Sequence, residues 1–83
     1  MAVSIDEIQT LVSLQLGVKG VKSTDLIVET LGAESADVMN LVVAIEEKYQ
    51  IFIDEGELAD VHTVADLFGL VRRLLPTPDY GDA

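Results

Sequence analysis

Residues 31–50 read LGAESADVMNLVVAIEEKYQ, and this stretch decides the fold. Apolar side chains recur in it every three or four residues, which is the spacing of one helix face. The members of this stripe are Val38, Leu41, Val42, Ile45 and Tyr49. A second apolar set, Ala36, Met39 and Val43, could be core or a partner surface, and its acidic edges favour a surface. We therefore expect a helix from Ser35 to about Gln50.

Capping signals predict two further helices. Ser4 followed by Glu7 fits a capping box, and helical apolar spacing then continues to Gly17, which is a typical stop. This pattern predicts a helix over residues 5–16. Thr63 followed by Asp66 predicts the start of the last helix, and Pro76 ends it. Its expected inner stripe is Val64, Leu67, Phe68, Val71 and Leu74 or Leu75.

The segments between these helices are less regular. Residues 17–34 predict a long loop that the cluster at residues 26–28 holds to the core, and residues 51–53 predict a buried connector. Residues 57–61 predict one helical turn. The expected fold is all-α, an antiparallel bundle of three main helices and one short helix. We expect it to form one domain over residues 1–76, followed by a flexible tail at 77–83.

Composition narrows the classes of function. The chain has 83 residues, enough for one domain, and its formal net charge is −10. This acidic balance disfavours nucleic acid and anionic lipid and suits basic protein surfaces. Without cysteine there is no disulfide or thiolate metal site. No apolar run could span a membrane and the start lacks a signal peptide, so we expect a cytoplasmic monomer.

Ser35 is the most informative polar residue. It is either the N-cap of the second helix or an attachment point for an anionic group, which helix N-termini favour. A catalytic serine needs a neighbouring base, and the chain has one histidine, His62, and no Gly-x-Ser-x-Gly elbow. The acids of residues 54–60 do not follow calcium-loop spacing. We therefore expect neither an enzyme nor a metal site.

The run from Leu31 to Asp37, with the helix to Tyr49, resembles the acyl carrier proteins, whose hallmark is Leu-Gly-x-Asp-Ser-Leu. The resemblance implies that a phosphopantetheinyl transferase attaches 4′-phosphopantetheine from coenzyme A to Ser35. The terminal thiol would then carry an acyl group as a thioester between enzymes of fatty acid, specialised lipid or polyketide synthesis. Glu34 and Ala36 replace the usual aspartate and leucine, which fits a specialised carrier.

The resemblance also implies how partners would be recognised. Enzymes with basic patches would dock on the second helix, and the residues expected to contact them are Glu34, Ala36, Asp37, Met39, Val43, Glu46 and Glu47. A small acyl pocket is expected between the second and last helices, near Leu41, Ile45, Ile53 and Leu67. The alternative is an unmodified helical adaptor that binds partners through the same helix, and modification of Ser35 discriminates between the two.

Overall fold

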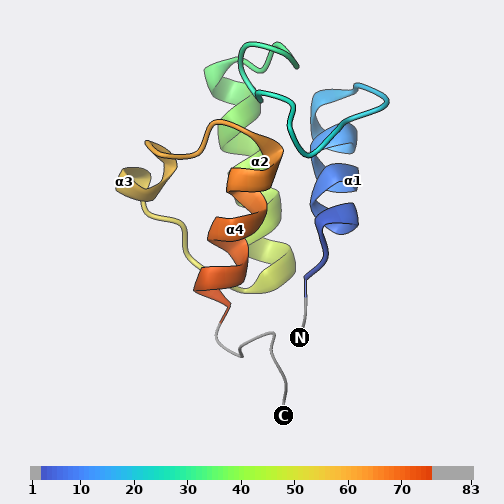
Figure 1. The fold of residues 1–83 in the computed structure, drawn as a ribbon. Helices are drawn as coiled ribbons and strands as arrows, with labels where there is room; N and C mark the ends of the chain where they lie inside the picture. The colour runs from blue at the N-terminus through green and yellow to red at the C-terminus, as the bar shows by residue number, and fades with distance from the viewer. Residues whose placement is uncertain (1–2, 76–83) are drawn as a thin grey trace.

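The computed structural model describes residues 3–75, and within them four helices follow one another without a strand (Figure 1). They are α1 (Ile5–Leu16), α2 (Ser35–Tyr49), α3 (Glu55–Leu58) and α4 (Val64–Leu74). Helix α1 packs against both α2 and α4 and runs opposite to them, whereas α3 lies at the side (Figure 1). The all-α prediction is confirmed. In this part of the chain, no helix is long and apolar enough to cross a membrane.

Two of the predicted capping boxes are present. The Ser4 hydroxyl accepts a hydrogen bond from the Glu7 amide, and the Glu7 carboxylate accepts one from the Ser4 amide, both at 3.2 Å. Thr63 and Asp66 exchange the same pair of bonds at 3.0 Å. Gly17 ends α1 in the left-handed conformation, with φ 68°. These local interactions place the helix boundaries where the sequence predicted them.

The core is apolar throughout. The stripe predicted on α2 faces inward, with Leu41, Val42, Ile45 and Tyr49 buried and Val38 half-buried. Helix α4 contributes Val64, Leu67 and Val71 as predicted, together with Leu70, which the predicted stripe lacked. Among residues 3–75 no polar or charged side chain is buried. Burial of these aliphatic groups is therefore the main stabilising term of this small domain.

The long loop between α1 and α2 is tied to the start of α4. The Ile27 amide donates to the His62 carbonyl at 2.9 Å, and the Ala65 amide donates to the Ser23 carbonyl at 2.8 Å. Ile27 is buried, but Val28 is 55% exposed, so the expectation that the whole cluster anchors the loop is wrong for Val28. Val28 lies within the hydrogen-bonded turn that begins at Leu26.

The connector between α2 and α3 also differs from its prediction. Ile53 is buried, but Phe52 is 76% exposed, because the residues on either side of it face the core. Helix α3 begins at Glu55, two residues earlier than expected, with Asp54 as its N-cap. The expected tail at residues 77–83 lies outside the described residues.

Candidate functional site

Ser35 is the first residue of α2, and its side chain is exposed. The N-cap is Glu34, which has extended backbone and whose amide donates to the Asp37 carboxylate at 3.0 Å. The interpretation of Ser35 as the cap is therefore wrong, because an acidic pair takes that role. Within residues 3–75 the Ser35 hydroxyl makes no hydrogen bond. The hydroxyl is therefore accessible at the N-terminus of α2.

A turn stabilised by backbone hydrogen bonds immediately precedes Ser35. The Gly32 amide donates to the Val28 carbonyl at 3.0 Å, and the Ala33 amide donates to the Ile27 carbonyl at 3.2 Å. Gly32 has φ +74°, a conformation that glycine adopts without the strain of a Cβ atom. Ala33 is buried and ties the turn to the core. The position of Ser35 is therefore set from both sides, by this turn and by α2.

The surroundings of Ser35 suit an attached anion better than nucleophilic catalysis. The first amides of a helix have no intrahelical acceptor, and the helix dipole adds positive potential there. A phosphodiester on the Ser35 oxygen would meet these amides. His62 is exposed and, in the part of the chain that the structure describes, forms no hydrogen bond with Ser35. Among the described residues, the histidine side chain is therefore not hydrogen-bonded to the hydroxyl that it would have to activate.

An apolar cavity of about 180 Å³ opens near the same end of α2. It is lined by Ile27, Val28, Val38, Leu41, Val42, Leu58, Val61 and Leu67. Val38 lies one helical turn beyond Ser35, and Val42 lies two turns beyond it. The loop before α2 forms one wall, and the segment around α3 forms another. The cavity therefore joins residues that are distant in the sequence.

Two of the four residues expected in an acyl pocket, Leu41 and Leu67, line this cavity. Ile45 and Ile53 do not line it. Ile45 lies a full turn beyond Leu41, so it is past the cavity. The sequence prediction did not include Val38 and Val42 among the lining residues. Both lie closer to Ser35 along the helix than Ile45 does, and this spacing could have identified them.

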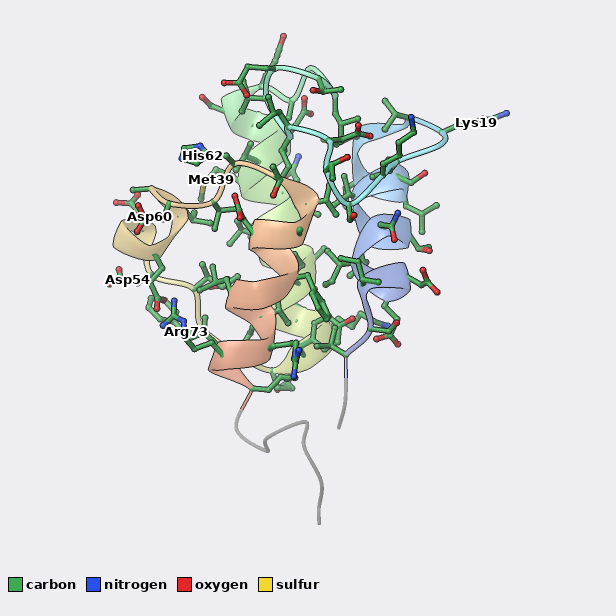
Figure 2. All side chains as sticks on the ribbon, in the orientation of Figure 1. Lys19, Met39, Asp54, Asp60, His62 and Arg73 are labelled. Carbon is green, nitrogen blue, oxygen red and sulfur yellow. The ribbon has the colours of Figure 1, made fainter. Side chains whose placement is uncertain are left out.

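The residues expected to contact partners fall into two groups. Glu34, Ala36, Met39, Val43 and Glu47 are exposed, and the last four share one face of α2. Asp37 and Glu46 are half-buried, and each carboxylate accepts a hydrogen bond from a backbone amide. The sequence prediction missed the exposed ring of Phe52. The signal that could have indicated it is the position of Phe52 between two other apolar residues, Ile51 and Ile53. Figure 2 shows the side chains of the described residues on the ribbon, with Met39 labelled.

Across residues 3–75, no group of three or more histidine, cysteine or acidic side chains is arranged to hold a metal ion. The exposed carboxylates between α2 and α4 include Asp54 and Asp60, which are labelled in Figure 2. The candidate site consists of Ser35, the N-terminus of α2 and the apolar cavity.

The sequence of the chain is similar to a known family and to curated proteins. The family model described as "Phosphopantetheine attachment site" matches residues 6–71. An acyl carrier protein of Campylobacter curvus (strain 525.92) is 38% identical over 71 residues, covering 83% of this chain and 92% of the relative. One from Wolinella succinogenes is 44% identical over 64 residues, covering 75% and 84%. Another, from Campylobacter jejuni (strain RM1221), is 32% identical over 73 residues, covering 86% and 95%.

A helical bundle with this match is a phosphopantetheine-bearing carrier domain. The chain belongs to the acyl carrier protein family. Carriers of this family bear 4′-phosphopantetheine as a covalently attached group, which is the cofactor of this chain. Acyl carrier proteins present substrates to catalysts and are not catalysts themselves, so this chain is not an enzyme.

Proposed function

We propose that Ser35 is the attachment residue and that the chain shuttles acyl thioesters between enzymes of fatty acid, specialised lipid or polyketide synthesis. One observation carries this proposal, namely that the Ser35 hydroxyl is exposed at the first residue of α2 and makes no hydrogen bond with any residue from 3 to 75. A phosphopantetheinyl transferase needs an accessible hydroxyl, and the helix terminus favours the phosphodiester that results. The family match over residues 6–71 supports the same assignment.

The chain supplies the attachment site for 4′-phosphopantetheine, whereas the reactive thiol belongs to the attached group. When attached, 4′-phosphopantetheine supplies a terminal thiol that holds an acyl group as a thioester. Ser35 holds the phosphate end, and the free amides of the first turn of α2 stabilise its negative charge. The cavity lined by Leu41 and Leu67 offers apolar surface to an acyl chain, and burying each methylene contributes about 0.8 kcal/mol.

Partner enzymes are expected on the exposed face of α2. Ala36, Met39 and Val43 provide apolar contact, and Glu34 and Glu47 provide negative charge at the edge. Such charges speed the encounter with a basic surface, whereas the apolar contacts prolong the complex. Asp37 and Glu46 would contribute charge while their carboxylates also hold backbone amides. We infer that the carrier acts as a monomer in the cytoplasm.

The deciding experiment is enzymatic modification of the purified chain. Incubation with coenzyme A, magnesium and a broad-specificity phosphopantetheinyl transferase should add one phosphopantetheine group. Peptide mass spectrometry should locate it on Ser35, and the Ser35→Ala variant should remain unmodified. Ser13→Ala is a matched control, since Ser13 lies within α1, and it should be modified like the parent.

The same experiment separates the carrier from an unmodified adaptor. An adaptor would gain no mass with any of several transferases, and its native form would have the mass of the bare chain. Modification at a residue other than Ser35 would contradict the assignment of the site. If Ser35 is modified, the intact mass of the loaded protein purified from its native cells would identify the acyl group and, with it, the pathway.

A further inference from the structure

We propose that Phe52 is an apolar anchor for the phosphopantetheinyl transferase, and that Glu46 is the positioning residue that holds it in place. The proposal rests on the function proposed for Ser35. It concerns the connector between α2 and α3, defined as residues 50–54. Phe52 is the most exposed of the large apolar side chains in the described part of the chain, at 76%.

The packing of the connector directs the ring outward. Ile51 is half-buried and Ile53 is 5% exposed, and both pack in or against the core. In extended backbone, successive side chains point to opposite sides. Because both isoleucines face the core, Phe52 between them faces solvent. Its exposure is therefore built into the path of the chain.

Glu46 holds this path by two hydrogen bonds. Its carboxylate oxygen Oε2 accepts from the Ile53 amide at 2.8 Å, and its carbonyl accepts from the Ile51 amide at 3.2 Å. The Gln50 side-chain amide adds a bond to the Glu47 carbonyl at 2.7 Å. The residues on both sides of Phe52 are thus held before any partner arrives. A pre-organised anchor loses less conformational entropy on binding than a mobile one.

The charge around Phe52 defines the partner's chemistry. Glu47, Asp54 and Glu55 are exposed acids that lie within five residues of the ring in the sequence. The nearest lysine, Lys48, has its ammonium 5.6 Å from the centroid of the Tyr49 ring. An apolar side chain in such an acidic segment complements an apolar pocket flanked by lysine and arginine. Aromatic anchors in such pockets frequently dominate the binding energy of an interface.

The transferase is the partner whose position this fold constrains most. The transferase must reach the Ser35 hydroxyl itself, because the phosphopantetheine arm is attached only by the reaction that the transferase catalyses. Helix α2 has 15 residues, so it is about 22 Å long at about 1.5 Å per residue. A standard interface of about 800 Å² per partner is about 28 Å across. One footprint of this size, laid along α2, is therefore long enough to extend from Ser35 to the connector that follows the helix.

Initial-rate kinetics of Ser35 modification test the proposal, with the carrier as the varied substrate. For Phe52→Ala we expect the KM to rise five- to tenfold while kcat stays within twofold of the parent. Leu14→Ala is the matched control, since Leu14 is 72% exposed on α1, and its KM should be unchanged. Glu46→Gln keeps an acceptor for the Ile53 amide but loses one negative charge, so its KM should rise less than that of Glu46→Ala. Glu46→Ala should raise the KM as Phe52→Ala does.

Other outcomes would overturn the proposal. They are an unchanged KM for Phe52→Ala, an equal rise for Leu14→Ala, or a rise for Glu46→Gln as large as that for Glu46→Ala. Self-association of the parent that Phe52→Ala abolishes would assign the ring to contact between copies instead. Circular dichroism should show an unchanged fold for each variant. If the parent itself is not modified at Ser35, the proposed function fails, which is a separate result.

Discussion

The hydroxyl of Tyr49 donates a hydrogen bond to the Glu7 carboxylate at 3.3 Å and so joins the end of α2 to the start of α1. The two residues are 42 positions apart in the sequence. Tyr49 is 5% exposed, so its ring belongs to the core while its oxygen reaches the rim. This contact fixes the relative placement of the two helices at the end of the bundle away from Ser35.

Alkaline titration should reveal this contact. Burial, followed by the negative charge of Glu7 and the hydrogen bond to it, raises the pKa of Tyr49 from 10.0 to about 12. A raised folded pKa stabilises the protein below the unfolded value, and this stability is lost as the pH rises from 10 to 12. In a Tyr80→Phe background, where Tyr49 is the remaining tyrosine, phenolate absorbance should therefore rise near pH 12.

The Tyr49→Phe variant is the control for that titration. It should lower the free energy of unfolding by about 1 kcal/mol at neutral pH, the usual contribution of one hydrogen bond. Its stability should fall less steeply between pH 10 and 12 than that of the parent. A phenolate transition at the ordinary pKa in the folded protein would contradict the buried contact.

Acid should weaken the start of α4 through Asp66. Hydrogen bonds from the Thr63 and His62 amides, foremost that of Thr63, lower the pKa of this carboxyl below 3.8. A lowered folded pKa stabilises the protein above the unfolded value, and this stability is lost as the pH falls through the folded one. Asp66→Asn should cost about 1 kcal/mol at neutral pH. It should also flatten the decline of melting temperature below pH 4.

Two glycine substitutions should have opposite signs. Gly32 has φ +74° in the turn before Ser35, and an added Cβ would meet no atom within 4 Å there. Gly32→Ala should therefore destabilise by about 1 kcal/mol through backbone strain alone. Gly69 lies inside α4 with ordinary backbone and equally open space, so Gly69→Ala should stabilise by about 1 kcal/mol. Thermal melts of both variants, with the same sign of change, would contradict this reading of the turn.

Adjacent glutamates on α2 should respond differently to charge reversal. Glu47 is exposed, so Glu47→Lys should slow association with the transferase several-fold at low salt and leave the fold intact. The difference should shrink as salt screens the charge. Glu46→Lys should in addition lower the free energy of unfolding by about 1 to 2 kcal/mol, because the Ile53 amide loses its acceptor. Stopped-flow binding and thermal melts measure the two effects separately.

Sequence alone determined the features that depend on close neighbours. A capping box needs only residues three apart, so Ser4 with Glu7 and Thr63 with Asp66 located the helix starts. Helical periodicity likewise requires only the repeat of apolar side chains, which identified the buried face of α2. The resemblance to acyl carrier proteins, later matched over residues 6–71, also followed from a contiguous motif.

Tertiary structure alone decided the features that depend on distant contacts. The cavity exists because the loop at Ile27 and the segment at Leu58 meet the first half of α2, and no local pattern encodes that meeting. The exposure of Phe52 follows from Glu46, which binds the amide of Ile53 and sets the path of the connector. A side chain's burial is decided by what packs over it, so a short apolar run specifies which residues are apolar but not which of them face solvent.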